Sequence, residues 1–188
     1  MKGVGPVKAV AFSTDAKVLA AGSGDGVITL WNINSNDEPI TLQGFAKGVT
    51  SIAFSPNGRM LAAGSDDTTA MLWNVASIET SSAGSWNIAS QKISVLATLK
   101  EHRGAITSTV FSPDGKTLAT GDSDGTIKLW FVTPYKVKEL ITLAGHADEA
   151  VTGLVFAPDG KWLASGSLDS TVRFWVAATD DEYRAQAG

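Results

Sequence analysis

The sequence repeats one pattern four times. Each copy has a short apolar run ending in Phe, a turn, a Leu-Ala-x-Gly segment, an Asp and, six residues later, a Trp. The copies cover Val7–Trp31, Val49–Trp73, Ile106–Trp130 and Val151–Trp175. Self-similarity at a period of this length is typical of an array of one supersecondary unit. Such a unit buries its apolar faces against its neighbours, so the repeat constrains the whole architecture.

Composition excludes several classes of function. The 188 residues carry a formal net charge of −4 and no cysteine, which rules out disulfides, thiolate metal sites and cysteine nucleophiles. No basic stripe is present, so we expect no nucleic-acid binding. No apolar run approaches the length of a membrane span, and Met1–Pro6 lacks the apolar core of a signal peptide. We therefore expect a cytoplasmic protein that does not bind membranes.

The third copy shows what one unit is. Its β-branched, apolar segments are separated by Ser-Pro-Asp-Gly and Ser-Asp-Gly, which are typical of tight turns. The predicted strands are Ala105–Ser112, Lys116–Gly121, Thr126–Val132 and Lys138–Leu143. Four short strands joined by tight turns form an antiparallel meander, and stacking on neighbouring copies buries both of its faces.

This pattern resembles the WD-repeat β-propeller family over nearly the whole chain, from Val7 to about Val176. The resemblance implies an all-β propeller of four four-stranded antiparallel meanders. It places the outer strands of the first two copies at Pro39–Leu42 and Ile93–Leu99. The sequence departs from the family where the Trp-Asp dipeptide is expected, as in Trp31-Asn32. The first turn, 13–16 (Ser-Thr-Asp-Ala), also lacks both Pro and Gly, so the first unit should be the loosest.

We expect a single propeller domain over 1–188, with repeats at about 7–44, 45–100, 101–144 and 145–188 and an insertion at 77–92. Family members close rings of seven or eight units, which four units do not complete. The chain is then half of an eight-bladed ring closed by a second copy, or a piece of a larger propeller. A closed four-bladed ring is a third option. Residues 179–188 are too polar and small to give a convincing fourth strand to the last copy.

The resemblance also implies a buried polar network in the third and fourth copies, in which His contacts Asp and Ser or Thr, backed by Trp. Its members would be His102, Thr120, Asp124 and Trp130, and then His146, Ser165, Asp169 and Trp175. The first two copies carry Ala21 and Ala63 at the hydroxyl position, with Val4 and Phe45 near the His position. Their Asp25 and Asp67 should therefore be solvated or capped by the backbone.

The same residues also invite a catalytic interpretation. Ser165, His146 and Asp169 resemble a hydrolase triad, and 121–125 (Gly-Asp-Ser-Asp-Gly) matches the G-x-S-x-G motif. That motif acts on a strand-turn-helix elbow, whereas here it lies between two predicted strands. We expect a structural network, no catalytic residue and no cofactor. The two histidines lie in different repeats without further nitrogen ligands nearby, so we expect no metal site.

The predicted function is a non-catalytic scaffold for protein–protein interaction. The alternative is a hydrolase-like propeller enzyme with a site in the central channel. The partner is an unidentified protein, together with a second copy of the chain or further repeats. The candidate partner-binding residues differ from copy to copy and are Lys8, Thr50, Asp66, Ser123, Asp148 and Leu168. Trp86, in the insertion, either anchors a partner or covers its own blade.

Overall fold

The computed structural model describes residues 5–76 and 93–176, which form four antiparallel β-sheets. Each sheet uses consecutive strands in chain order, and we call the sheets blades 1 to 4. Blade 1 holds β1 (Val7–Phe12), β2 (Val18–Ser23), β3 (Ile28–Asn32) and β4 (Ile40–Leu42). Blade 2 holds β5 (Val49–Phe54), β6 (Met60–Ser65), β7 (Ala70–Asn74) and β8 (Ser94–Leu99).

The other two blades follow the same order. Blade 3 holds β9 (Ile106–Phe111), β10 (Thr117–Asp122), β11 (Thr126–Thr133) and β12 (Lys136–Ala144). Blade 4 holds β13 (Val151–Phe156), β14 (Trp162–Ser167) and β15 (Val172–Val176). The propeller meanders expected from the repeats are thus confirmed, except that blade 4 has three strands in the described residues instead of four.

The tight turns follow from local chemistry. In blade 3 the Ser112 hydroxyl donates to Asp114 (2.6 Å) and accepts from the backbone N–H of Thr117 (2.9 Å), which fixes the β9–β10 turn. Gly115 takes a φ of 70° at the end of this turn, a conformation that suits glycine. In blade 1 the equivalent residue is Ala16, with a φ of 56°. The first turn therefore holds a non-glycine residue in a disfavoured backbone conformation.

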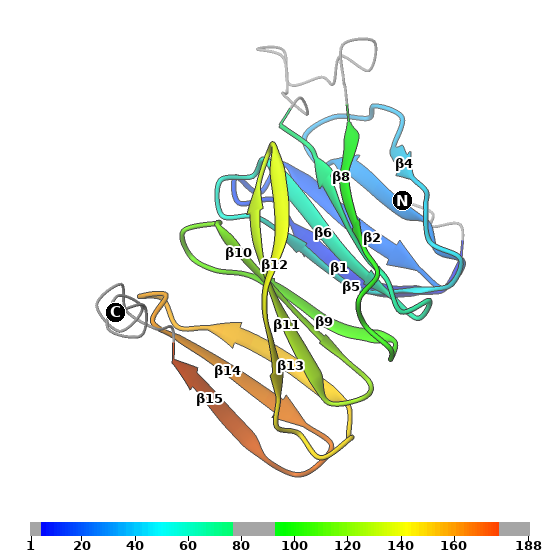
Figure 1. The fold of residues 1–188 in the computed structure, drawn as a ribbon. Helices are drawn as coiled ribbons and strands as arrows, with labels where there is room; N and C mark the ends of the chain where they lie inside the picture. Colours follow the sequence, from blue (N-terminus) through cyan, green and yellow to red (C-terminus); the bar gives the residue numbers. More distant parts are fainter. Residues whose placement is uncertain (1–4, 77–92, 177–188) are drawn as a thin grey trace.

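The blades stack side by side in an arc, with the first strand of each blade on the inside (Figure 1). Along this inner edge β1 packs on β5, β5 on β9, and β9 on β13. Three apolar cores fill the spaces between successive blades, one for each pair. Each core combines second- and third-strand residues of one blade with residues from the first three strands of the next, so stacking buries both sets together.

The arc is open. β13 packs on β9 and has no comparable packing on β1, and blades 1 and 4 lie at opposite ends of the described arc (Figure 1). The described residues therefore do not form a closed four-bladed ring. None of them belongs to a helix long and apolar enough to span a membrane.

Candidate functional site

Blade 4 holds a hydrogen-bonded network between its second and third strands. His146 lies with Nδ1 2.8 Å from Oδ2 of Asp169 and Nε2 2.7 Å from Oγ of Ser165. The indole N–H of Trp175 donates to the same Ser165 hydroxyl at 2.9 Å. Because that hydroxyl accepts from the indole, it is oriented to donate to Nε2, which leaves Nδ1–H to donate to the carboxylate. The imidazole is fully buried.

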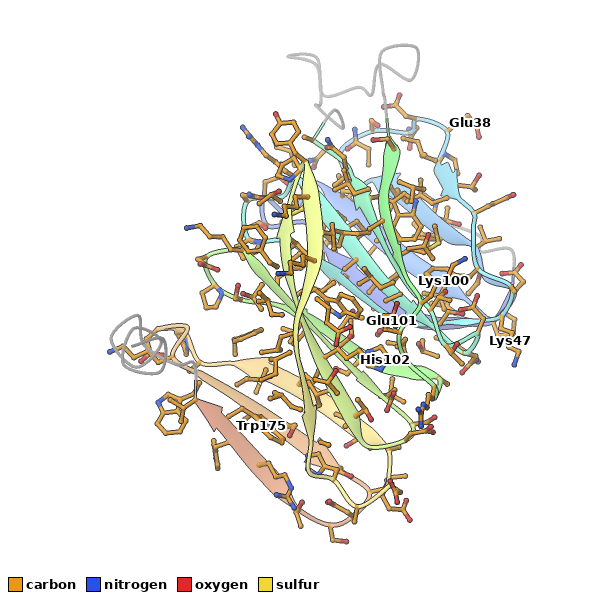
Figure 2. The ribbon with its side chains drawn as sticks, viewed as in Figure 1. Glu38, Lys47, Lys100, Glu101, His102 and Trp175 are labelled. Carbon is orange, nitrogen blue, oxygen red and sulfur yellow. The ribbon has the colours of Figure 1, made fainter. Side chains whose placement is uncertain are left out.

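Blade 3 builds the same network around His102, which is buried although the preceding Lys100 and Glu101 are exposed (Figure 2). Nε2 of His102 lies 2.6 Å from Oγ1 of Thr120, and the indole of Trp130 donates to that hydroxyl at 2.8 Å. Nδ1 lies 2.7 Å from Oδ2 of Asp122.

The expectation that Asp124 accepts from His102 is therefore wrong. Asp122 takes that place, and its other oxygen accepts the backbone N–H groups of Asp124 (3.0 Å) and Thr126 (2.9 Å). Asp122 is 1% exposed, whereas Asp124 is exposed at the surface. Packing inside the blade selects the carboxylate that is buried beside the imidazole. The sequence does contain a signal for this difference, because the third copy has Asp122 where the other three copies have Ser.

Blade 2 replaces the network with an apolar contact. Phe45 occupies the place of the histidine and packs edge-on against Trp73, with ring centroids 5.8 Å apart. Ala63, at the hydroxyl position, is fully buried. The Asp67 carboxylate instead accepts the backbone N–H of Ala46 (2.7 Å) and of Thr69 (3.0 Å). In this blade the Asp serves as a backbone cap.

In blade 1 Asp25 is exposed and accepts a hydrogen bond from the Ser23 hydroxyl. Ala21 is buried at the hydroxyl position, so no side chain there can join an imidazole to the strand. Val4 lies outside the described residues. The four blades thus share the same Trp and strand geometry, while only blades 3 and 4 carry the His network in the described structure.

Hydrogen bonding shifts the two network carboxylates toward their charged form. In blade 3, burial opposes ionisation, but the bonds from His102 and from the backbone of Thr126 hold the pKa of Asp122 below its usual value. In blade 4 the hydroxyl of Thr171 has the largest effect, and with His146 it holds the pKa of Asp169 well below its usual value against the effect of burial. Both carboxylates are therefore anionic acceptors at neutral pH.

The rim is the edge of the arc where β1, β5, β9 and β13 begin and where the second and third strands are joined. Two predicted partner-binding residues there form an ion pair between blades, with Nζ of Lys8 2.8 Å from Oδ2 of Asp66. The hydroxyl of Thr50 donates to the carbonyl of Ile106 in the next blade. The hydroxyl of Ser123 accepts the backbone N–H of Ala105 at 3.0 Å.

The other predicted rim residues project into solvent. Leu168 is 64% exposed, and Asp148 is exposed in the loop before β13. Trp86, the remaining candidate, lies outside the described residues, as does the rest of 77–92. The described residues contain no group of three His, Asp or Glu side chains that could hold a metal ion.

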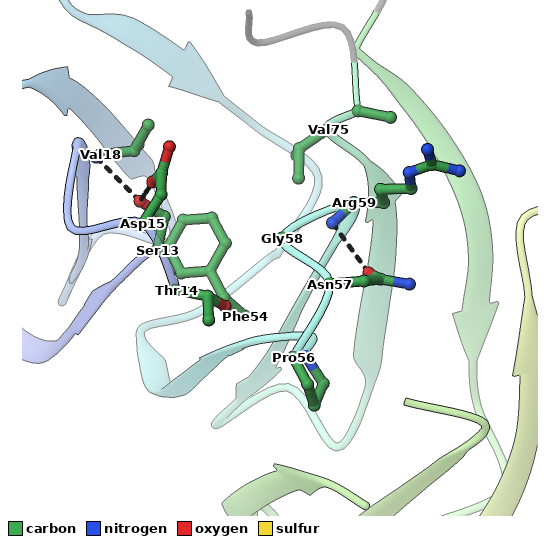
Figure 3. Close-up of a pocket in the computed structure, with 11 residues that line it drawn as sticks. Ser13, Thr14, Asp15, Val18, Phe54, Pro56, Asn57, Gly58, Arg59 and Val75 are labelled. Atoms are coloured by element: carbon green, nitrogen blue, oxygen red, sulfur yellow. Dashed lines mark hydrogen bonds between the residues drawn. The ribbon is translucent and has the colours of Figure 1, made fainter. Parts of the chain in front are cut away.

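A hollow with both polar and apolar lining lies at the edge opposite the rim, between the first turns of blades 1 and 2 (Figure 3). Its acceptors are used within their own turns, since Asp15 accepts from Ser13 (2.7 Å) and Asn57 from the N–H of Arg59 (3.0 Å). Phe54 forms its inner wall, next to Val18 of the neighbouring blade. At this hollow Phe54, the last residue of β5, lies next to Val18 on β2 of the blade before it.

These features define a β-propeller array of antiparallel blades, of which blades 3 and 4 carry buried His–Asp networks in the described residues. The model of the family "WD domain, G-beta repeat" matches four times, at residues 2–32, 37–74, 93–130 and 137–176. The chain belongs to this family, as the resemblance predicted. Its fold is similar to that of the computationally designed Ika4 protein in its crystal structure. The TM-score is 0.74, and the sequences are 27% identical with 94% of each chain covered. A comparison with curated proteins gives no match.

Proposed function

We propose that this chain is a non-catalytic scaffold that binds a protein partner through its rim. The observation that carries the proposal is that the residues most like a catalytic triad are sealed inside a blade. Ser165 is 1% exposed and the imidazole of His146 is fully buried. A nucleophile needs access to its substrate and free approach to its oxygen. Here the indole N–H of Trp175 donates to the Ser165 hydroxyl, which fits a structural role.

The rim supplies what a scaffold needs. The WD-repeat scaffold holds its hairpins and loops on rigid sheets, and such loops carry function when a scaffold positions them. Equivalent rim positions differ from blade to blade, since the residue before the hairpin Asp is Gly24, Asp66 and Ser123 in the first three copies and the exposed Leu168 in the last. A surface that mixes an apolar side chain with carboxylates such as Asp148 suits a polypeptide partner with apolar and basic side chains.

We further propose that the working form is an eight-bladed ring made of two copies. The described arc has four blades and leaves an apolar sheet face uncovered at each end. Val10 and Phe12 of blade 1 are 64% and 58% exposed, and Phe174 of blade 4 is 68% exposed. Exposed apolar faces of this kind mark protein interfaces. A second copy supplies the missing neighbour for both faces at once.

Selection from a displayed peptide library tests the scaffold proposal. Binders to the native chain should lose affinity for the rim variants Leu168→Ser and Asp148→Ala. They should keep it for Tyr135→Ser, because Tyr135 is 97% exposed in the β11–β12 turn at the opposite edge. A set of binders that is insensitive to both rim variants would contradict the assignment of the rim.

The hydrolase alternative has its own test. A broad panel of ester, peptide and phosphate substrates should show no turnover above background. Turnover that is abolished by Ser165→Ala, in a variant that remains folded by circular dichroism, would overturn the non-catalytic assignment. His146→Gln would serve as the second variant, because it removes the proposed base while keeping a hydrogen-bonding side chain.

A further inference from the structure

We infer that a second copy docks head to tail on this chain, with Val7 of one copy seated over Gly166 of the other. This inference rests on the two-copy ring proposed above and specifies its interface. The blade-1 face is formed by Val7, Val10 and Phe12, and the blade-4 face by Trp162, Ala164, Val172 and Phe174, with Gly166 beside them. The chain already contains three interfaces between successive blades, and they show how such faces meet.

Each internal interface joins a β-branched side chain to a glycine. Val49 of blade 2 lies over Gly22 of blade 1, so close that a Cβ on that glycine would be 2.7 Å from the Val49 Cβ. The same construction at Gly64 places a Cβ 2.7 Å from the Cβ of Ile106. Contacts this short leave no room for any side chain on the second strand. Only glycine allows the next blade to approach so closely.

The third interface repeats the arrangement. A Cβ on Gly121 of blade 3 would lie 2.7 Å from Cγ1 of Val151 in blade 4. Val151, like Val49 and Ile106, is fully buried. The glycine and the β-branched residue therefore form one fixed contact of the array, made by the second strand of one blade and the first strand of the next.

The two ends of the chain carry the two halves of this contact, unmatched. Gly166 is the equivalent glycine of blade 4, and a Cβ placed on it would meet only Thr152 Oγ1, at 3.8 Å. Val7 is the equivalent side chain of blade 1, and it is 52% exposed. Gly166 of one copy thus lacks the β-branched side chain that packs on the other three glycines, and Val7 of the next copy lacks a glycine to pack on. Docking blade 1 of one copy on blade 4 of another matches them.

A hydrogen bond accompanies the contact between blades 2 and 3 and the contact between blades 3 and 4. The hydroxyl of Thr50 donates to the carbonyl of Ile106, and the hydroxyl of Thr107 donates to the carbonyl of Val151. The equivalent hydroxyl in blade 4 is Thr152, which is exposed and contacts the carbonyl of Gly166 in its own blade at 3.2 Å. By the same rule, its partner across the interface is the carbonyl of Val7 in the second copy.

The apolar surfaces of the two faces also correspond. Val172 and Phe174 are 65% and 68% exposed, although Ile28 and Leu30 at the same positions of blade 1 are fully buried by blade 2. The blade-4 face includes an apolar hollow lined by Trp162 and Phe174. Phe54 fills the equivalent place between blades 1 and 2, so Phe12 of the second copy is the side chain that fits this hollow.

The pairing also explains why the contact joins unlike faces. Two blade-4 faces meeting symmetrically would place glycine against glycine and leave Val7 exposed in both copies. A blade-1 face docked on a blade-4 face is a heterologous contact. Repeated contacts of this kind close into a ring when the rotation from one copy to the next is a whole fraction of a full turn. Two half-rings that each present both faces form two such contacts, so each copy uses its blade-1 face and its blade-4 face once.

The test is a set of size-swap variants measured by light scattering and by sedimentation over a dilution series. Gly166→Val should remain folded, because in a single copy its Cβ makes only an ordinary contact, with Thr152 Oγ1 at 3.8 Å. It should weaken the assembly by roughly 10- to 100-fold or more, as expected for inserting a side chain into a tight interface. Adding Val7→Gly on the same chain removes the opposing side chain and should restore assembly. Tyr135→Ser, which is exposed but away from both faces, is the matched control and should assemble like the native chain.

The outcomes separate this inference from the proposals above. Weakening by Gly166→Val with rescue by the double variant supports the Val7–Gly166 contact. A Gly166→Val variant that dimerises as tightly as the native chain would overturn that contact and leave the two-copy ring standing. A native chain that stays monomeric and unfolds cooperatively would overturn both. Assemblies longer than two copies that Gly166→Val dissolves would support the contact and overturn the eight-bladed ring. None of these results bears on the peptide-binding test of the rim.

Discussion

The imidazole of His102 donates to the carboxylate of Asp122, with Nδ1 and Oδ2 2.7 Å apart. In the next blade the corresponding bond joins His146 to Asp169, two positions further along its repeat. The same network is thus built from different positions of the repeat. Because Asp122 fills the buried position, Asp124 is released to the rim, where it is exposed.

Asp122→Ala should destabilise blade 3 far more than Asp124→Ala. The first change leaves the His102 imidazole and two backbone N–H groups without their acceptor inside the blade, a loss of roughly 2–4 kcal/mol in the free energy of unfolding. The second removes an exposed side chain and should change it by less than about 0.5 kcal/mol. Urea unfolding at one fixed protein concentration measures both. Equal losses would show that Asp124 shares the buried role.

Stability should fall in acid partly because of Asp122. Its pKa is lowered in the folded chain, so the folded state favours the ionised form more than the unfolded state does. The resulting stabilisation is present above the unfolded-state pKa of about 3.9 and is lost as the pH falls through that value toward the folded pKa.

Asp122→Asn removes this titration while keeping an acceptor oxygen. Its unfolding midpoint should therefore change less between pH 6 and pH 3 than that of the native chain. Urea midpoints across this range provide the measurement. Parallel profiles for the two chains would show that Asp122 contributes nothing to the acid sensitivity.

Asp169→Ala should lower the melting temperature more than Asp25→Ala. Asp169 accepts from His146, from the hydroxyl of Thr171 at 2.6 Å and from the Thr171 backbone, whereas Asp25 accepts from Ser23 and has no imidazole at hand in the described structure. Thermal unfolding followed by circular dichroism compares the pair. A larger loss for Asp25→Ala would contradict the account of the blade 4 network.

Ala16→Gly should stabilise the chain by about 0.5–1 kcal/mol. Ala16 has a φ of 56°, a left-handed conformation that strains a residue with a Cβ and suits glycine. Gly58, at the equivalent position of blade 2, has a φ of 69°, so Gly58→Ala is the matched reverse change and should destabilise the chain. Differential scanning calorimetry gives both values. Destabilisation by Ala16→Gly would mean that the gain in unfolded-chain entropy outweighs the relief of strain.

The strands were predictable because their signals are local. The first turn of each copy, Ser-Pro-Asp-Gly in the third, and the tight turn before each Trp set the meander. The predicted strand Lys138–Leu143 falls within the observed Lys136–Ala144. The partner of His102 was not predictable from spacing, because Asp122 ends β10 and Asp124 lies in the turn just after it, and packing decides which of them is buried. Phe45 illustrates the same limit, since its edge-on contact with Trp73 depends on how the loop before β5 folds onto blade 2.

The contacts between blades were harder to predict from the sequence than the strands were. A glycine in Leu-Ala-x-Gly is compatible with many strand environments, and its close contact with the next blade emerges only when the sheets are stacked. The same holds for Thr50 and Lys8, which the repeat pattern placed on the rim. Stacking engages the hydroxyl of Thr50 with the carbonyl of Ile106 and pairs Lys8 with Asp66.

The solution mass of the unmodified chain tests the central claim most directly. Light scattering coupled to size exclusion, at micromolar concentrations, should give one species of twice the 19.6 kDa of a single chain. Interfaces between whole blades are large and apolar, so this species should persist on dilution. A monodisperse species of 19.6 kDa that unfolds cooperatively would contradict the closed two-copy ring.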